Sequence, residues 1–443
     1  MLLVGCGAAR HEQEPPAGRS TPAGVVIHRD SFPAPEPDSR APEPGGCARQ
    51  PLEPFDLIQT RFDVPIPAIV DPRAEMHRFY ARLDEVLAGR SNQPLRIAVY
   101  GDSNLTEDEL TGEMRRVLQG RYGDAGHGYV AVGKPWTWYR HMDVVHDLEP
   151  RAWKSYAVST HAVSDQHYGF AGIAAESTSG RARAWVETAA APAPVGQRAD
   201  RVEVFYLERP RGRSFSVRLD GKDLATVPTD GPALGVGHRR FELEDGPHRI
   251  GFVAEYGVRL FGVVLERKQG RVVVDSLGVG GANEVLLARM QADSVRSALK
   301  HRPYDLVVFL TGATEDDTDA HDAALRKRLV LHREALPGAA LLVMSPPDYA
   351  YGSRRLPRPS KRIVRLSRRK QRVAEELGCA FWDFHGAMGG ELSIARFSNA
   401  GMAHSDLAHL NASGNAYMAR RFLEALRRGF ESYVPEACAA RGP

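Results

Sequence analysis

The stretch Ile97-Ala98-Val99-Tyr100-Gly101-Asp102-Ser103-Asn104 joins a short apolar run to a glycine turn, and a helical pattern over 108–119 follows it. Four more apolar runs come later, over 272–274, 306–310, 341–344 and 380–382. Each is followed by a helical pattern; these cover 284–299, 321–334, 361–377 and 413–428. Continuous apolar runs that alternate with helices are typical of a parallel sheet covered on both faces. The sequence therefore predicts an α/β fold, a three-layer α/β/α domain with a five-stranded parallel sheet.

A segment of different character, 149–269, separates the first two of these strands. Apolar and polar residues alternate there in five runs, which cover 202–207, 214–219, 239–243, 248–253 and 258–265. Turns such as Asp220-Gly221 and Asp245-Gly246 lie between them, and no helical period is present. This pattern predicts an antiparallel β-sandwich inserted into the α/β domain. The α/β domain then consists of 51–148 and 270–434, with a tail over 435–443.

Residues 1–50 differ again, because Pro, Gly, Glu, Ala and Arg recur there with almost no aromatic residue. Such a composition does not repay the entropy of ordering and predicts a disordered tether. The opening Met-Leu-Leu-Val-Gly-Cys6 is similar to the end of a bacterial lipoprotein signal, in which the cysteine receives lipid. Only five residues precede Cys6, fewer than a signal needs. Two interpretations stay open: export to the cell envelope or periplasm with lipid at Cys6, or a cytoplasmic protein with a poorly ordered tail.

Composition limits the classes of function. The chain has 443 residues, 43% of them hydrophobic, so it can bury a core; yet no stretch approaches the roughly 18 apolar residues of a membrane span. The formal net charge is only +3, but 353–372 contains ten cations and no acid. A solvated helix face is the first interpretation of this basic segment, attraction to an anionic envelope polymer or lipid the second, and nucleic acid the last.

Two motifs combine into a catalytic constellation. Ser103 stands at the carboxyl end of the first predicted strand, where open α/β sheets bind their ligands, although a helix N-cap would also explain a serine there. Asp406-Leu407-Ala408-His409 lies just before the last predicted helix. A histidine three residues after an aspartate can offer one ring nitrogen to a serine while the carboxylate holds the other. We therefore predict Ser103, Asp406 and His409 as catalytic residues.

Two glycine turns follow the second and third predicted strands, Gly278-Val279-Gly280-Gly281 and Gly312-Ala313-Thr314-Glu315. Backbone amides exposed beside Ser103 would form an oxyanion hole, although each turn alone is more often a plain strand-to-helix connection.

The Ser103 turn, the two glycine turns and Asp406-Leu407-Ala408-His409 form four sequence blocks, numbered here in chain order. In this order they resemble the SGNH (GDSL-type) hydrolase superfamily. The resemblance is greatest to the bacterial peptidoglycan O-acetyl esterases, which carry a β-sandwich between the first two blocks. The resemblance implies Ser103 as nucleophile, His409 as base and Asp406 as its orienting group. It also implies the amides of Ser103 and Gly281 as oxyanion donors. The third donor in the family is usually an asparagine, and here that position is Thr314; Asn104 and Asn283 are candidate substitutes.

Aromatic residues suggest where a sugar would bind. Trp136-Thr137-Trp138-Tyr139-Arg140-His141 follows the first block, and we predict Trp136, Trp138 and Tyr139 as substrate-binding residues, with core packing as the alternative. The aromatic residues of the insertion have the same two interpretations; they are Trp185, Tyr206 and Tyr256.

Together these features predict a serine esterase of the cell envelope that removes O-acetyl groups from peptidoglycan or another glycan. We expect no metal and no organic cofactor, an acetylated glycan as partner, no specific nucleic acid, and membrane attachment only through Cys6. An O-acetyltransferase would use the same residues, and a non-catalytic glycan-binding protein is the alternative. Of the remaining cysteines, Cys379 belongs to a buried strand, whereas Cys47 and Cys438 are either paired in an oxidising compartment or free.

Overall fold

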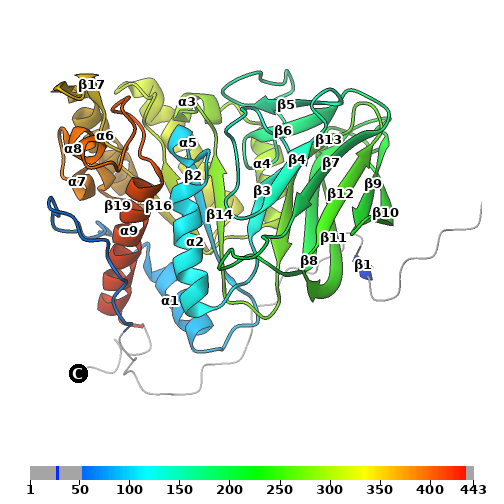
Figure 1. Ribbon diagram of the computed structural model, residues 1–443, viewed down its shortest axis with the longest axis horizontal. Helices are drawn as coiled ribbons and strands as arrows, with labels where there is room; N and C mark the ends of the chain where they lie inside the picture. The colour runs from blue at the N-terminus through cyan, green and yellow to red at the C-terminus, as the bar shows by residue number, and fades with distance from the viewer. Residues whose placement is uncertain (1–25, 29–51, 436–443) are drawn as a thin grey trace, which may run out of the picture.

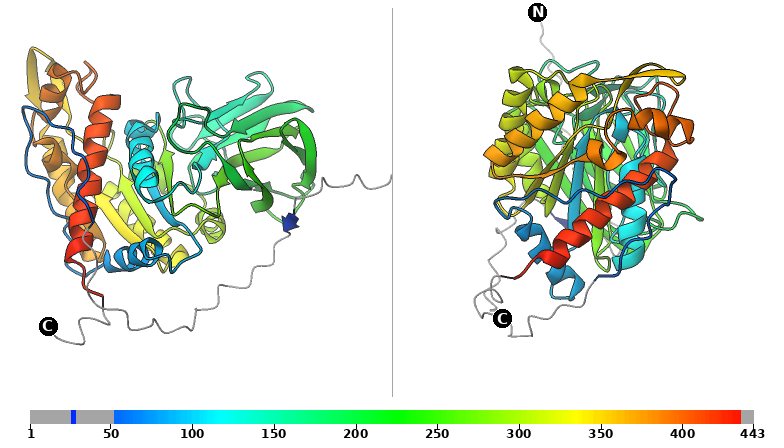
Figure 2. Two further views of the ribbon diagram at one scale, coloured as in Figure 1. Left: turned by 60° about the horizontal axis from the view of Figure 1, so that its bottom comes forward. Right: turned by 90° about the vertical axis from the view of Figure 1, so that its left-hand side faces the viewer.

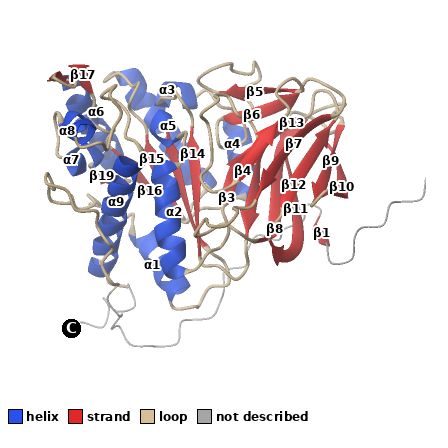
Figure 3. Cartoon of the chain, viewed as in Figure 1, coloured by secondary structure: helices blue, strands red, loops and turns tan. Residues whose placement is uncertain are grey.

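The computed structural model describes residues 26–28 and 52–435 (Figure 1). Residues 26–28 fall within the predicted disordered tether but form a strand that pairs with residues 240–242. The rest of the tether, the lipid at Cys6 and the Cys47–Cys438 pair lie outside the described residues. Within them the chain forms an α/β part and a β-rich part that stand side by side (Figure 3). No helix of the described part is long and apolar enough to cross a membrane.

Five parallel strands form the central sheet, in the order β14 (Val272–Gly278), β2 (Leu95–Gly101), β15 (Leu306–Leu310), β16 (Ala340–Met344) and β19 (Ala380–Trp382). The predicted five-stranded parallel sheet is thus confirmed. The first strand in sequence, β2, lies between the second and third, so the connections reverse direction around it. Open α/β sheets bind ligands beyond the carboxyl ends of their strands at such a reversal, and Ser103 stands at the end of β2.

Helices cover both faces of this sheet, as predicted. Alternate residues of β2 point to opposite faces: Ile97 and Val99 pack in one core, Ala98 and Tyr100 in the other. The first core is closed by α1 (His77–Leu87), α2 (Glu109–Tyr122), α7 (Phe384–Met388), α8 (Ser393–Asn399) and α9 (Ala412–Ser432). The second is closed by α4 (Ala292–His301), α5 (Asp319–Ala335) and α6 (Lys361–Glu376). Two layers of helices around one sheet are visible in Figure 2.

The helix predicted over 284–299 is two helices, a short α3 (Glu284–Leu287) and α4. The amide of Gln291 donates to the carbonyl of Gln166 in the β-rich part, at 3.1 Å, instead of continuing the first helix. Sequence periodicity did not show this break, because the partner of the amide lies far away along the chain.

The β-rich part is a sandwich of two antiparallel sheets. One sheet has the order β1-β11-β8-β13-β6-β5, with β3 also paired to β13, and the other has the order β10-β9-β12-β7-β4. The first sheet contains β1 (Val26–His28), β3 (Gly128–Ala131), β5 (Trp153–Ala157), β6 (Ile173–Ser177), β8 (Ala199–Glu208), β11 (Gly235–Gly246) and β13 (Arg259–Glu266). The second contains β4 (Val145–Leu148), β7 (Ala182–Glu187), β9 (Ser214–Leu219), β10 (Lys222–Pro228) and β12 (Arg249–Ala254). Because β3 and β4 precede residue 149, the inserted sandwich begins earlier than the predicted boundary.

The sandwich and the α/β part share one buried seam. The outer face of the first sheet contributes Phe205 and Leu207 to the same core as Tyr304 and α4. Beside it, the guanidinium of Arg96 in β2 donates to the buried carboxylate of Glu266 in β13 at 2.8 and 2.9 Å. A buried ion pair of this kind fixes one arrangement of the two parts, because separating the charges would leave each without a partner.

Two elements that the sequence did not indicate follow β16: the short strands β17 (Ala350–Ser353) and β18 (Leu356–Pro359), which pair as a hairpin. The hairpin stands at the same end of the sheet as the Ser103 turn.

Candidate active site

The structure brings the three predicted catalytic side chains together. Ser103 begins a short 3-10 turn (Ser103–Leu105) after β2, and its Oγ lies 2.9 Å from Nε2 of His409. Nδ1 of the same ring lies 2.7 Å from Oδ2 of Asp406. These are the two hydrogen bonds of a Ser-His-Asp triad, and the first of them joins residues 306 positions apart.

The turn that carries the base is held in a fixed shape. Oδ1 of Asp406 accepts hydrogen bonds from the amides of Ala408 and His409, at 2.9 and 3.1 Å. Leu407 between them has a left-handed φ of 58° and a completely buried side chain. A left-handed leucine is strained and persists only where its surroundings hold it, and here the buried side chain does so.

The Asp406 carboxylate is kept ionised. Partial burial would raise its pKa, but the hydrogen bonds from the His409 ring and from the two amides outweigh burial, and the pKa is lowered below its ordinary value. An ionised carboxylate fixes the ring with its proton on Nδ1, so that Nε2 faces Ser103 as the acceptor.

The nucleophile turn packs tightly against the sheet edge. A Cβ on Gly101 would lie 2.5 Å from the Leu105 side chain, and one on Gly278 would lie 2.6 Å from the Leu105 backbone. Glycine at the ends of β2 and β14 is therefore what allows Leu105 to fill the space beneath Ser103.

Asp102, which the sequence did not single out, joins the nucleophile turn to the third block. Its Oδ2 accepts hydrogen bonds from the amides of Gly312 and Ala313, both at 2.9 Å, and its Oδ1 accepts two from Asn104. The opposite side of the third block is held by Arg362 of α6, which donates to the carbonyls of Gly312 at 3.2 Å and Ala313 at 2.9 Å. The loop is thus bound through its amides and its carbonyls.

Two backbone amides are available for an oxyanion. No described residue accepts a hydrogen bond from the amide of Ser103 or of Gly281. The third position differs, because the exposed Thr314 hydroxyl donates to the carbonyls of Ala282 at 3.3 Å and Gly281 at 3.5 Å. Threonine hydroxyls commonly bond nearby carbonyls in this way. In this geometry the Thr314 hydroxyl is occupied by the protein itself.

The two candidate substitutes are also engaged, to different degrees. The side-chain amide of Asn104 donates to Asp102 at 3.0 Å. The side-chain oxygen of Asn283 accepts from the amide of Leu286 at 2.9 Å and caps α3. Its amide nitrogen makes no hydrogen bond within the described part of the chain, so Asn283 keeps a free donor close to Gly281.

Trp136 and Trp138 lie beside the oxyanion loop. A Cβ on Gly280 would lie 3.1 Å from the Trp136 ring, which therefore covers this glycine. The Trp138 ring is nearly parallel to it, with centroids 6.4 Å apart, and is 55% exposed. Tyr139, in contrast, is only 3% exposed, so the structure removes it from the predicted substrate-binding residues and supports core packing.

The aromatic residues of the sandwich also differ in their exposure to solvent. Tyr206 is completely buried and fills the core, whereas Tyr256 is 65% exposed. Trp185 is partly exposed, and the guanidinium of Arg249 covers its ring at 4.8 Å from the centroid.

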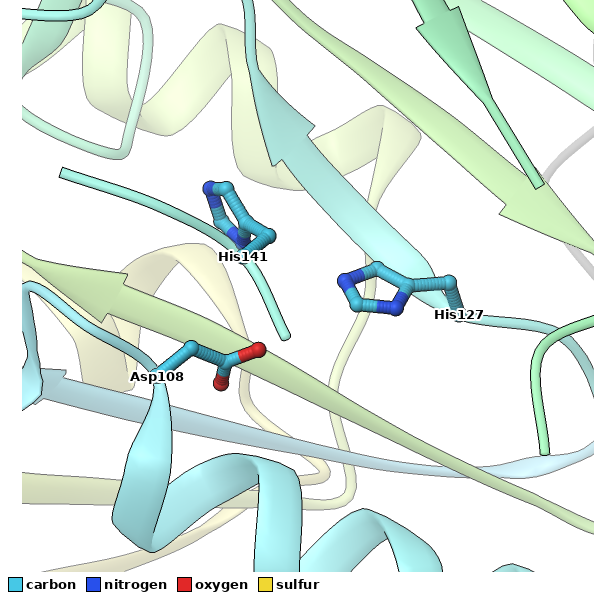
Figure 4. Close-up of side chains that lie close together, drawn as sticks. All are labelled: Asp108, His127 and His141. Carbon is cyan, nitrogen blue, oxygen red and sulfur yellow. The ribbon is translucent and has the colours of Figure 1, made fainter. Parts of the chain in front are cut away.

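A buried cluster behind the nucleophile turn has the composition of a metal site. Ligand atoms of Asp108, His127 and His141 lie within 4.8 Å of one another (Figure 4). Both carboxylate oxygens of Asp108, however, already accept a hydrogen bond from the buried Arg115, and the amide of Met142 adds another at 2.8 Å. A divalent cation would have to displace a guanidinium, and tetrahedral zinc needs ligand atoms only about 3.3 Å apart. The hydrogen bonds of Asp108 to Arg115 and to the amide of Met142 have a structural role, because they hold the loop that follows Trp136.

The basic segment is largely neutralised within the protein. Cations of α6 pair with acids in and just after the third block: Arg365 with Asp317, Arg369 with Asp319, and the buried Lys370 with Glu315 at 3.0 Å. Within the described residues, the cations of this segment that have neither an ion pair nor a hydrogen bond are Arg355, Arg358 and Arg368.

Known proteins resemble the chain in family and in fold. Residues 250–417 match the model of the GDSL-like lipase/acylhydrolase family. The solved structure of a peptidoglycan O-acetylesterase superposes with a TM-score of 0.70 at 23% identity, over 82% of this chain and 99% of that one. A lipase/acylhydrolase from Enterococcus faecalis matches 36% of this chain and 77% of its own, at 21% identity and a TM-score of 0.28. A search of curated protein sequences gives no significant match.

Proposed function

We propose that the protein is a carboxylic ester hydrolase of the SGNH superfamily of GDSL-like acylhydrolases, and that it removes O-acetyl groups from peptidoglycan or another cell-envelope glycan. The observation that carries the proposal is the continuous hydrogen-bonded path from Ser103 Oγ through the His409 ring to Asp406.

The triad geometry supports a two-step acyl transfer. His409 Nε2 takes the proton of Ser103 while Oγ attacks the acetyl carbonyl carbon, and Asp406 stabilises the imidazolium that results. The sugar oxygen then leaves with that proton, and an acetyl group stays on Ser103. Water attacks the acetyl-enzyme with His409 as base again, which releases acetate and restores the serine.

The oxyanion of each tetrahedral intermediate needs donors that are already in place. The unpartnered amides of Ser103 and Gly281 supply two of them. Loss of one well-placed donor costs on the order of 10²- to 10³-fold in turnover, so the occupied hydroxyl of Thr314 lowers the rate but leaves the reaction possible.

Two observations favour a glycan as the substrate. The exposed Trp138 and the partly exposed Trp136 form an aromatic platform next to Gly280, and sugar rings pack on such faces. The protein whose structure superposes with a TM-score of 0.70 is a peptidoglycan O-acetylesterase, which also favours a glycan.

An O-acetyltransferase would differ only in the acceptor, a sugar hydroxyl instead of water. A non-catalytic glycan-binding protein is the second candidate, and the hydrogen bonds of Thr314 to Gly281 and Ala282 are the observation in its favour.

Acetate release separates these possibilities. Purified protein is incubated with O-acetylated peptidoglycan and with p-nitrophenyl acetate, and Ser103→Ala serves as control. We expect release from both substrates that disappears in the variant. Hydrolysis of neither would support the non-catalytic candidate, and acetyl transfer to an added glycan without free acetate would identify a transferase.

We also propose that the protein works in the cell envelope, attached by lipid at Cys6. Two points support this proposal. An esterase that acts on a cell-envelope glycan must meet its substrate in the envelope, and residues 1–6 are similar to the end of a bacterial lipoprotein signal. Fractionation of cells that express the natural gene, with and without Cys6→Ser, tests it: membrane association should require the cysteine.

A further inference from the structure

The elements of the site stand in a row along the carboxyl edge of the sheet, in the order of the strands. The Trp136 ring lies on Gly280 after β14, Ser103 follows β2, Thr314 follows β15, and the β17–β18 hairpin follows β16. Neighbouring strands lie about 4.8 Å apart, so the three steps from β14 to β16 span about 14 Å. A row of this length suits an extended polymer, with the nucleophile between an aromatic end and the hairpin.

The hairpin is attached to the catalytic turn. The amide of Ala350, the first residue of β17, donates to the carbonyl of Leu407 at 3.1 Å, and Leu407 lies between the base and its aspartate. On its other side, Arg354 donates to the carbonyl of Ser398 in α8 at 2.9 Å. The hairpin is therefore held beside the triad at both ends of β17.

The exposed side of the hairpin is cationic and apolar. Tyr351 is 45% exposed and Leu356 is 78% exposed. Arg358 stands opposite Tyr351 in the register of the two strands, and Arg355 lies at the tip. Both arginines are exposed and have no acid or carbonyl partner among the described residues, unlike Arg365 and the other paired cations of α6.

We propose that Arg355 and Arg358 bind carboxylates of the peptides that a peptidoglycan strand carries, so that the substrate is peptide-bearing peptidoglycan and not a neutral acetylated glycan. This inference rests on the proposed function for the nature of the strand. A guanidinium matches a carboxylate in charge and in its paired donors. A neutral polysaccharide offers no group that would compensate these two charges.

The distances agree with such a substrate. Arg355 is five residues from Ala350, so the tip lies roughly 16 Å from the catalytic turn at about 3.3 Å per strand residue. A peptide of five residues attached to the strand reaches as far, because an extended chain also covers about 3.3 Å per residue. The tip is thus within reach of a peptide whose sugar occupies the site.

Binding to a catalytically inactive protein tests the inference separately from turnover. The full chain with Ser103→Ala is titrated with O-acetylated peptidoglycan fragments and with the same fragments after an amidase has removed their peptides. We expect Kd to be about 3- to 10-fold lower for the peptide-bearing fragments at low salt, as two exposed charge pairs provide. The difference should shrink as salt rises from 0.05 to about 0.5 M, because screening shortens the range of the interaction.

The variants assign the difference to the hairpin. In the Ser103→Ala background, Arg355→Gln with Arg358→Gln should give equal Kd values for both fragments, whereas Arg368→Gln, an unpaired cation on α6, should leave the difference unchanged. Thermal melting of the double variant verifies that it is folded. Equal affinity of the parent for both fragments, or an equal loss in Arg368→Gln, would overturn the inference. Binding to vesicles of anionic lipid is measured as well. The inference would also be overturned if the double variant lost its binding to the vesicles but kept the Kd difference between the two fragments.

Failure of the proposed function would look different. If the active protein released no acetate from any O-acetylated glycan, the esterase assignment would fall. A Kd difference that depends on Arg355 and Arg358 would still establish recognition of the peptide-bearing strand.

Discussion

The hydroxyl oxygen of Thr314 lies 3.3 Å from the carbonyl oxygen of Ala282 and donates a hydrogen bond to it. The side chain at the third oxyanion position is therefore occupied by the backbone of the second block. In the proposed mechanism the backbone amides of Ser103 and Gly281 then serve the transition state without the third side chain, and unless the free amide of Asn283 takes its place we expect a lower rate than with three donors.

Replacement of Thr314 tests this arrangement. We expect Thr314→Asn to raise kcat on p-nitrophenyl acetate, by at most about 10²- to 10³-fold, because the longer amide can reach the oxyanion. Thr314→Val is the matched control, which removes the hydroxyl and keeps the shape; it should leave kcat nearly unchanged. A drop in kcat for both variants would mean that the threonine hydroxyl is itself the working donor.

The triad variants test the chemistry. Ser103→Ala and His409→Ala should each lower kcat by on the order of 10⁴-fold or more, because each side chain makes or breaks a bond in the reaction. Asp406→Asn should be milder, since the serine and the ring remain. All three should melt close to the parent temperature, because these side chains lie outside the hydrophobic cores. Normal turnover in Ser103→Ala would remove the esterase activity from this site.

Asp102→Asn tests the link between the first and third blocks. The carboxylate accepts from Asn104 on one oxygen and from Gly312 and Ala313 on the other, and an amide has a single acceptor oxygen. One pair of donors then loses its partner, at a cost of roughly 1–3 kcal/mol in the free energy of unfolding. We expect kcat to fall about 10- to 100-fold through misplacement of the loop, with little change in KM. An unchanged kcat in a destabilised protein would show that the link serves stability alone.

Stability should decrease in mild acid. Burial lowers the pKa of His141 and of His332 to about 3, and it places those of His127 and His146 well below the ordinary 6.5. Below pH 6.5 the unfolded chain binds protons at these positions and the folded chain does not, so the free energy of unfolding falls as pH falls. Each histidine contributes about 1.4 kcal/mol per pH unit once its unfolded form is protonated.

Urea unfolding between pH 7.5 and 5 measures this dependence. Above pH 5 the histidines dominate, because carboxylates whose pKa is lowered by folding, such as Asp406, lose their contribution only at lower pH. His332→Gln should reduce the slope of the free energy of unfolding against pH by the contribution of one proton. A free energy of unfolding that is constant from pH 7.5 to 5 would contradict the prediction.

The cysteines outside the described residues bear on the compartment. If the protein is exported, Cys47 and Cys438 can form a disulfide that persists, and mass spectrometry of protein from its natural envelope should then find neither as a free thiol. Free thiols at both positions would remove this support for export. Cys379 should stay reduced in either case, because burial raises the pKa of its thiol to about 11 and keeps it in the unreactive form.

Much of the fold could be predicted because it is local in the sequence. A run such as Leu306–Leu310 is apolar throughout since both faces of its strand are buried, and the prediction matches β15 residue for residue. The residues of the candidate triad were equally accessible, because a serine after a strand and Asp406-x-x-His409 are the residue types and spacings that such a triad requires.

The remaining features depend on partners far apart in the sequence. The break between α3 and α4 is set by the carbonyl of Gln166, and the early start of the sandwich is set by the pairing of β3 with β13. The segment 353–372 looked like a cationic surface because its acids, among them Asp317 and Asp319, lie on another element. Charged residues pair when the fold places them close together, and the composition of a segment does not show which residues those are.

The sequence by itself determined the parallel sheet and the antiparallel sandwich, and it was enough to propose Ser103, His409 and Asp406 as a triad. Only the tertiary structure decided that Tyr139 is buried and that the Thr314 hydroxyl is occupied by Ala282. The physical reason is the range of the interactions. Hydrophobic periodicity and turn chemistry act between near neighbours in the chain, whereas burial and the satisfaction of a donor depend on whichever segment the fold places beside it.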